Sequence, residues 1–411
     1  MPSFQSDTIA SRLALGAFTP EQAFLAALEL YRHDRLFAVP AKTREIIAKR
    51  GADTAIVLLG RSDFGGHLIH ALRARARVLC VVDDFRAHRG EQFHGLDFIS
   101  SDRFLEMARQ DPDLVGVNAC RSDYSRRFFD GLCRDRGIAL ANFEQIARAF
   151  DLNAVLDHRV HDWGAVIAAR AGEYQQLVRR MADPYSADTL HAVLTFHLTG
   201  NPEWFLNVAR PYSTLYVRSG LFALDKDEKM VDCGASIGES TTALMHATEG
   251  SFARSWMIEP DRINVATLQG FMRKYAGTAH AAKMSLHPVA VGDVRGRAPF
   301  EHLGHHGGSV LPPTRADACP EADYVAVERI DDIVDDAPTI IKMDIEGFEL
   351  PALKGAERTI RAARPKLLVS AYHRSADLLD IPAWIDSIAA DYRIGLRHHT
   401  EDRWDTCLYF Y

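Results

Sequence analysis

A short glycine-containing segment in the C-terminal half has residue types suited to holding a nucleotide-like ligand. Residues 231–240 read VDCGASIGES and follow an apolar run that predicts a strand. Gly234 and Gly238 let the backbone approach a ligand closely, at a turn leading from this strand into a helix. A dinucleotide fingerprint needs another glycine where Ser236 stands, to make room for pyrophosphate. The segment therefore favours a nucleoside-type ligand without phosphate. The residues expected to contact it are Asp232, Gly234, Ala235, Ser236 and Gly238.

Carboxylates follow the next two predicted strands along the chain. Glu259 ends the apolar run 255–259, and Asp293 follows the run 286–292. Parallel strands place their carboxyl ends at one edge of a sheet, so both carboxylates should converge on the glycine segment. We expect Glu259 to accept both ribose hydroxyls, Asp293 to accept from an adenine amino group, and Asp232 to receive an ammonium group. Together the acids predict S-adenosylmethionine, an adenosine derivative that carries no phosphate.

A denser polar motif follows the fourth predicted strand of this half. The run 339–344 leads into DIEGFE at 344–349 and then LKGA at 353–356. In these motifs the chain resembles the FkbM family of S-adenosylmethionine-dependent methyltransferases, over roughly residues 212–400. The earlier glycine segment matches that family as well, and so does the pair Tyr372-His373 after a further apolar strand. One departure is Ser236, which stands where the family usually has Asn.

The resemblance implies methyl transfer from S-adenosylmethionine to a hydroxyl of a sugar, glycan precursor or secondary metabolite. A hydroxyl is a poor nucleophile until its proton is removed or held by a hydrogen bond, a task that suits a histidine or a carboxylate. We expect His373 to act as the base and Asp344 to align the acceptor, with Glu346 beside them and Asp344 also near the cofactor. The same three side chains are suitable metal ligands. The prediction is catalysis without a metal, and the metal alternative stays open.

Alternating strands and helices must position these residues, so the fold class is α/β. The C-terminal half predicts a seven-strand Rossmann-like methyltransferase sheet that ends in an antiparallel hairpin. Its strands are expected at 229–233, 255–259, 286–292, 339–344, 366–371, 392–398 and 406–411. The loop 302–313 is rich in glycine and histidine, and it is a candidate lid over the acceptor.

A smaller Rossmann-like α/β pattern precedes this half. The predicted domains are a helical segment at 1–53, the small α/β domain at 54–150, a helical bridge at 151–211 and the methyltransferase domain at 212–411. The turn 60–66 matches only the first and third glycines of a dinucleotide fingerprint, and Asp83 and Asp84 follow about twenty residues later. A nicotinamide-dependent oxidoreductase is therefore a rival reading. A second rival is a binding protein that keeps the methyltransferase fold without turnover.

The composition of the whole chain limits its partners. Its 411 residues are 47% hydrophobic and 25% charged, which is typical of globular protein with two or more domains. A net charge of -7 offers no general attraction for nucleic acid or anionic membranes. The N-terminus lacks the layout of a secretion signal, and no CxxC pair occurs among the six cysteines. We expect a cytoplasmic enzyme with a small-molecule or glycan acceptor and no nucleic-acid or membrane partner. Whether it forms a homo-oligomer is left open.

Overall fold

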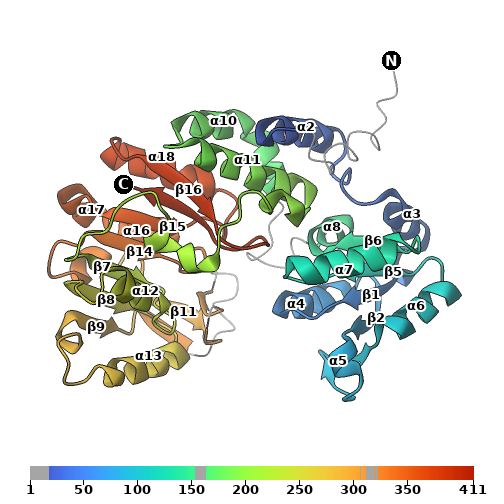
Figure 1. Cartoon of the computed structure of the whole chain (residues 1–411), viewed down its shortest axis with the longest axis horizontal. Helices are drawn as coiled ribbons and strands as arrows, with labels where there is room; N and C mark the ends of the chain where they lie inside the picture. Colours follow the sequence, from blue (N-terminus) through green and yellow to red (C-terminus); the bar gives the residue numbers. More distant parts are fainter. Residues whose placement is uncertain (1–17, 153–162, 306, 312–319, 321–322) are drawn as a thin grey trace. The chain divides into compact units, whose positions relative to one another are not determined.

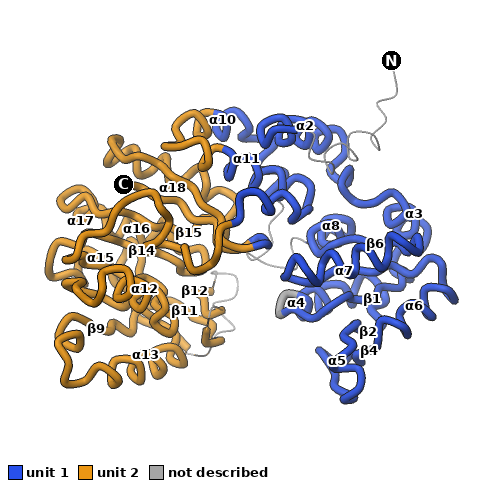
Figure 2. The backbone as a smooth tube through the Cα atoms, in the orientation of Figure 1, with its two compact units in different colours: residues 1–175, 188–209, 401–403 blue, residues 176–187, 210–400, 404–411 orange. Residues whose placement is uncertain are grey.

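The structure, a computed structural model, describes residues 18–152, 163–305, 307–311, 320 and 323–411. The chain divides into two compact units, which Figure 2 colours separately. The first unit comprises residues 1–175, 188–209 and 401–403, and the second comprises residues 176–187, 210–400 and 404–411. None of the helices in the described part of the chain is long and apolar enough to span a membrane.

The first unit contains a six-stranded sheet with the order β3-β4-β2-β1-β5-β6. Figure 1 labels four of these strands, β1, β2, β5 and β6. The strands are β1 (Ala55–Leu59), β2 (Arg77–Val82), β3 (Gln92–Phe93), β4 (Leu96–Ile99), β5 (Val115–Asn118) and β6 (Ala139–Asn142). All neighbours pair in parallel except β3 and β4. Every residue of β1 and β5 is buried, as expected for central parallel strands covered on both faces. The predicted small α/β pattern is therefore confirmed.

Helices connect these strands and precede them. They are α2 (Pro20–His33), α3 (Ala41–Arg50), α4 (Asp63–Leu72), α5 (Asp84–Ala87), α6 (Ser101–Gln110), α7 (Asp123–Arg134), α8 (Phe143–Ala149) and α9 (Trp163–Ala169). Two more helices, α10 (Ala171–Arg180) and α11 (Pro184–Thr199), contribute residues to both units. Many begin at side-chain caps, such as Thr19 before α2, which forms a capping box with Gln22.

The second unit is built on a seven-stranded sheet with the order β16-β17-β15-β14-β7-β8-β9. Its strands are β7 (Lys229–Cys233), β8 (Arg254–Ile258), β9 (Met284–His287), β14 (Ile340–Met343), β15 (Lys366–Ser370), β16 (Ile394–His398) and β17 (Thr406–Phe410). The first five pair in parallel, whereas β17 pairs antiparallel with both β15 and β16. The predicted α/β sheet with a terminal antiparallel hairpin is confirmed.

The third strand of this sheet is shorter than predicted. It ends at His287, because Pro288 has no backbone N–H to donate to a neighbouring strand, and Val289 N closes a tight turn onto His287 O at 2.9 Å. The following residues form β10 (Ala290–Val291), which belongs to a separate four-stranded sheet with the order β10-β13-β11-β12. The other members are β11 (Gly296–Glu301), β12 (Ser309–Val310) and β13 (Tyr324–Glu328), and this sheet was not predicted.

Helices pack on the seven-stranded sheet and close its core. They are α12 (Glu239–Ala247), α13 (Arg262–Lys274), α15 (Ile330–Ile333), α16 (Glu349–Lys354), α17 (Glu357–Ala363) and α18 (Asp377–Ala389). One core joins Leu244 of α12 and Leu268 of α13 to strand residues such as Met230, Met257 and Ile340. The short 3-10 turn η5 (Tyr216–Arg218) packs into the same core. These contacts hold β7, β8 and β14 side by side, so their carboxyl ends lie at one edge.

Candidate active site

A tight turn of residues 234–238 connects β7 to α12. Gly234 has a φ of 74°, and a Cβ atom there would lie 1.9 Å from the backbone oxygen of Asp344. Only glycine avoids this overlap, so the ends of β7 and β14 approach each other closely. Ser236 and Gly238 also have positive φ values, 49° and 98°. A non-glycine residue in this region of φ is often found at a ligand site, where the surrounding structure supports it.

Glu259 supports the turn from the end of β8. Its side chain is nearly fully buried, and Oε2 accepts from Ser236 N at 2.8 Å while Oε1 accepts from Asp261 N at 2.9 Å. Ala235 N donates to Ile258 O at 3.1 Å and ties the turn to the same strand. Burial raises the pKa of Glu259 to about 7, against the effect of the two N–H groups. The structure thus brings Glu259 to the glycine segment, as the strand pattern predicts.

Asp232 is fully buried and its carboxylate is paired inside the sheet. Oδ1 lies 3.2 Å from Lys342 Nζ, and Oδ2 accepts from Thr241 Oγ1 at 3.1 Å. Burial raises the pKa of the Asp232 carboxyl, and Lys342 opposes that shift. The same ammonium donates to Gly234 O at 2.7 Å. Asp232 and Lys342 therefore hold the turn in place, and this placement gives no support to a direct contact between Asp232 and a ligand's ammonium group.

Asp293 is not brought to this edge. It is exposed, on the turn that leads from β10 to β11, because β10 leaves the seven-stranded sheet. The residue at the end of the third strand is instead the half-buried His287, whose Nε2 lies 3.0 Å from Ser285 Oγ. The sequence assignment of Asp293 to the adenine amino group depended on a strand that Pro288 ends early, so the structure does not support it.

The candidate lid is anchored where the structure describes it, at residues 302–305 and 307–311. Asp261 Oδ2 accepts from the backbone N–H groups of Leu303 and Gly304, at 3.0 and 2.8 Å. His305 O accepts from Ser236 Oγ at 3.2 Å and from Asn264 Nδ2 at 2.9 Å. These bonds join the loop to the start of α13, and the bond from Ser236 joins it to the glycine turn. Residue 306 and residues 312–313 of the predicted lid lie outside the described residues.

Asp344 follows β14 and lies between two tyrosine hydroxyls. Tyr216 OH donates to Oδ2 at 2.8 Å, and Tyr372 OH donates to Oδ1 at 3.0 Å. Burial raises the pKa of Asp344, but His373, Lys342 and the hydrogen bonds from Tyr216 and Ser370 outweigh it and lower the pKa below its usual value. Sequence reasoning missed both tyrosine contacts. Tyr372 stands in the Tyr-His pair that carries the resemblance, whereas nothing in the sequence around Tyr216 marks it.

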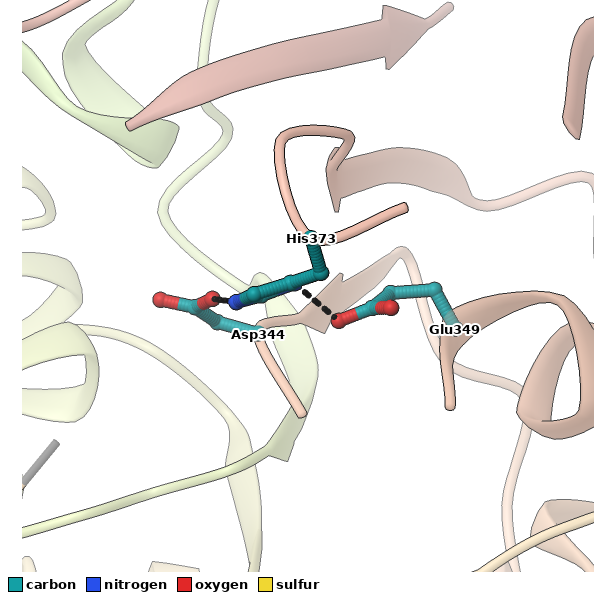
Figure 3. Close-up of side chains that lie close together, drawn as sticks. All are labelled: Asp344, Glu349 and His373. Carbon is teal, nitrogen blue, oxygen red and sulfur yellow. Dashed lines mark ion pairs between the residues drawn. The ribbon is translucent and has the colours of Figure 1, made fainter. Parts of the chain in front are cut away.

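His373 follows β15 and is surrounded by carboxylates, two of which Figure 3 shows on either side of its ring. Its Nδ1 lies 2.9 Å from Glu349 Oε1. Its Nε2 lies 3.6 Å from Asp344 Oδ1 and 3.7 Å from Glu346 Oε2. The structure therefore brings together the three residues that the sequence predicts for catalysis. It adds Glu349, the last residue of the DIEGFE motif, which sequence reasoning left without a role.

This arrangement determines the charge of His373. Burial lowers the pKa of His373, but Glu349, Glu346 and Asp344 overcome that effect and raise it to about 10. A histidine with this pKa carries its proton at neutral pH and cannot accept another. The His373 imidazolium therefore stabilises the surrounding carboxylates. This arrangement does not support the predicted role of His373 as general base. Asp344 and Glu346 are the groups able to accept a proton here.

A chain of buried polar groups supports Tyr216 from behind. Tyr216 N donates to Tyr409 OH at 3.2 Å, and the same hydroxyl lies 3.0 Å from His399 Nε2. Thr214 Oγ1 donates to Pro211 O at 2.7 Å and lies 3.2 Å from His399 Nδ1. Because the threonine proton is used elsewhere, Nδ1 of His399 donates and Nε2 accepts from the tyrosine, which is the pattern of a neutral imidazole.

The neutral state of His399 predicts an acid-sensitive fold. Burial lowers the pKa of His399 to about 4 in the folded unit. In the unfolded chain the same histidine is protonated with a pKa near 6.5. This stability is present above pH 6.5 and is lost as the pH falls toward 4. Between about pH 7 and about pH 5 the free energy of unfolding of the unchanged protein should fall by roughly 2 kcal/mol more than that of His399→Gln. Unfolding curves that move in parallel for both proteins would contradict this.

The glycine turn of the first unit has a structural explanation. Gly60 has a φ of 82°, and a Cβ atom there would lie 2.2 Å from Cys120 Sγ. Asp83 Oδ1 caps α5 by accepting from the N–H groups of Phe85 and Arg86, both at 3.1 Å. Asp84 binds the N–H and the hydroxyl of Ser101, at 2.8 and 2.7 Å. Asp83 is therefore used as a helix cap and Asp84 is bound to the first residue of α6, so the hypothesis of a nicotinamide site gains no support.

A seven-stranded α/β sheet with a terminal antiparallel hairpin and a glycine turn after a central strand is the fold of a methyltransferase. The family model described as "Methyltransferase FkbM domain" matches residues 232–394. A crystal structure of methyltransferase FkbM from Methylobacillus flagellatus KT is 51% identical to this chain, covers 95% of it and 99% of its own length, and has a TM-score of 0.86. This chain belongs to the FkbM methyltransferase family. A search of curated proteins found no match.

Proposed function

We propose that this methyltransferase uses S-adenosylmethionine and methylates a hydroxyl of a small molecule or glycan. The observation that carries the proposal is the convergence of three strand ends, where β8, β7 and β14 bring together Glu259, the 234–238 turn and Asp344. Ligands of open α/β sheets bind outside the carboxyl ends of the strands. A cytoplasmic location and the lack of a nucleic-acid partner stay predictions from composition.

The turn fits an adenosine-containing donor without phosphate. Gly234 and Gly238 allow the positive φ values of this turn, which keep it short and close to the end of β14. Each oxygen of Glu259 accepts one backbone N–H and keeps a second lone pair, which suits ribose hydroxyls. Ser236 stands where a pyrophosphate site needs glycine. When bound, S-adenosylmethionine would supply a methyl group on a positively charged sulfur.

The acceptor hydroxyl is proposed to lie beside Asp344 and Glu346. Each of these side chains is 23% exposed, so both can meet a ligand. Tyr216 and Tyr372 fix the orientation of the Asp344 carboxylate. A carboxylate only accepts hydrogen bonds, so it can orient a hydroxyl and take its proton. His373, on the buried side, offsets part of the negative charge of this cluster.

Calorimetric titration of the full chain tests the donor. S-Adenosylhomocysteine should bind with micromolar affinity, about -8 kcal/mol. Glu259→Ala should weaken binding at least about tenfold, because it removes both the ribose acceptor and the support of the Ser236 N–H. Glu328→Ala is the matched control, since Glu328 pairs with Arg295 on the four-stranded sheet.

Two results of the calorimetric titration would contradict the proposed donor. Absence of heat from a folded protein, or equal affinity in Glu259→Ala and the unchanged chain, would refute the donor assignment. Binding of a nicotinamide dinucleotide in place of S-adenosylhomocysteine would favour the oxidoreductase reading. For the acceptor, incubation with methyl-labelled donor and a panel of sugar and metabolite hydroxyls should label an oxygen. Label found only on nitrogen or carbon would refute the choice of a hydroxyl.

A further inference from the structure

We propose that His373 Nε2, Asp344 and Glu346 form a site for a divalent cation of the Mg²⁺ or Mn²⁺ class. The proposal deepens the function above, and it rests on that function only for what the cation does in methyl transfer. Cation binding itself requires neither donor nor acceptor. The two ideas can therefore fail separately.

The distances around Nε2 suit a shared ion better than direct hydrogen bonds. Asp344 Oδ1 lies 3.6 Å and Glu346 Oε2 lies 3.7 Å from Nε2, both beyond normal hydrogen-bond length. Ligand atoms that each lie about 2.1 Å from one ion are about 3 to 4 Å apart. The proposed ligand atoms Asp344 Oδ1 and Glu346 Oε2 thus lie at nearly the same distance from Nε2. A cation between Nε2 and the two carboxylates would bring these groups into bonding contact.

The ring nitrogen that faces this position lacks a hydrogen-bond partner. His373 is 8% exposed, and among the described residues its Nε2 makes no hydrogen bond. A buried polar atom without a partner carries a free-energy cost, which a cation at this point would remove. The proton on Nε2 would leave to solvent when the ion binds. The unpartnered Nε2 is a separate observation from the cluster of carboxylates, because it concerns the nitrogen that is directed at the position between Asp344 and Glu346.

Negative charge is in excess around the ring. The carboxylates of Asp344, Glu346 and Glu349 face the imidazole within 3.7 Å, and Lys342 is the other cation that acts on Asp344. One imidazolium balances only one of these charges. A divalent cation balances more of them, and it does so from the side where Asp344 and Glu346 are partly exposed to a ligand.

Glu349 lies where it can orient the His373 ring without binding the ion itself. It is fully buried and faces Nδ1 at 2.9 Å, on the opposite side of the ring from Asp344 (Figure 3). Histidines that bind a metal through one nitrogen usually direct the other at a carboxylate or carbonyl, which fixes the ring and its tautomer. The hydroxyls of Tyr216 and Tyr372 fix Asp344 in the same way. Glu349 is therefore inferred to be a positioning residue and not a ligand.

The ligand types select the class of ion. Two carboxylates and one imidazole favour oxygen-preferring ions such as Mn²⁺ and Mg²⁺ over ions that need thiolates. None of the described residues in this cluster is a cysteine. Beside the acceptor, such an ion would hold the hydroxyl oxygen and make its proton easier to remove.

Electron paramagnetic resonance with Mn²⁺ tests the site on the metal-free full chain, without donor or acceptor. Addition of Mn²⁺ should give a single bound ion per chain, displaced by excess Mg²⁺, with electron-spin-echo modulation from an imidazole nitrogen. Glu346→Gln and Glu349→Gln should each weaken Mn²⁺ binding at least about tenfold. His373→Gln should abolish the nitrogen modulation. Glu328→Gln, a matched change on the four-stranded sheet, should leave both signals unchanged.

Several outcomes would overturn the proposal. Mn²⁺ that stays free in the presence of folded protein excludes the site. Bound Mn²⁺ without nitrogen modulation, or with unchanged affinity in Glu346→Gln, places the ion elsewhere. Because Glu346 is partly exposed, its variant should fold even if the buried changes at His373 and Glu349 do not. Titration with S-adenosylhomocysteine then reports separately on the proposed donor.

Discussion

His373→Gln should lower kcat for methyl transfer by about 10²-fold, because Asp344 and Glu346 lose the ring that orients them, while S-adenosylhomocysteine binds as it does to the unchanged chain. The reason is the position of the ring. It contacts Asp344 and Glu346, which are proposed to hold the acceptor, whereas the donor is proposed to bind at Glu259 and the 234–238 turn. The measurement is kcat with an acceptor that the unchanged protein methylates, beside calorimetry with S-adenosylhomocysteine.

A control separates this effect from general damage. His280→Gln changes a histidine of the same unit whose Nε2 contacts Gly250 O at 3.0 Å, away from the strand ends, and it should keep kcat within about threefold of the unchanged value. Loss of His373 also removes the cationic partner of buried Glu349, so the thermal midpoint should fall. Equal losses of kcat and of S-adenosylhomocysteine affinity in His373→Gln would show that the residue supports the whole site. Unchanged kcat would make it purely structural.

Gly234→Ala should destabilise the second unit by more than about 3 kcal/mol and abolish S-adenosylhomocysteine binding. Two costs add at this position. An alanine at a φ of 74° is strained by about 1 to 2 kcal/mol, and its Cβ would lie 1.9 Å from Asp344 O. Because the obstacle is backbone at the end of β14, β7 and β14 must separate where the donor is proposed to bind.

Gly277→Ala carries only the first of these costs, the strain of a positive φ. Gly277 has nearly the same φ, 79°, and a Cβ atom there meets nothing within 4 Å. Its variant should therefore lose only about 1 to 2 kcal/mol and bind S-adenosylhomocysteine normally. Scanning calorimetry should follow the transition whose midpoint S-adenosylhomocysteine raises, since that transition belongs to the unit that binds it. Equal losses in the two variants would mean that the turn relaxes around the added carbon.

Much of this architecture could be predicted from the sequence because it depends on local periodicity. Continuous apolar runs of about five residues, separated by helical segments, are typical of parallel strands buried on both faces. The bounds predicted for β7, 229–233, are those of the structure, and the hairpin strands agree within two residues at each end. The predicted bounds of the third strand were wrong because one apolar run continued across Pro288. The pattern of apolar residues gives no sign that Pro288 lacks the backbone N–H, and this lack ends β9 there.

The sequence by itself determined which residues stand at the strand ends, since alternation of apolar runs and turns is a local property. It therefore predicted the 234–238 turn, Glu259, Asp344 and His373 as neighbours of one sheet edge. Only the tertiary structure decided how these groups are charged and paired. The pKa of His373 depends on Glu349, which reaches the ring from α16, and the carboxylate of Asp232 is bound by Lys342 of the next strand. Such pairings depend on distances between side chains of separate elements. Burial also changes the pKa values of these side chains, and the spacing of residues along the chain does not determine burial.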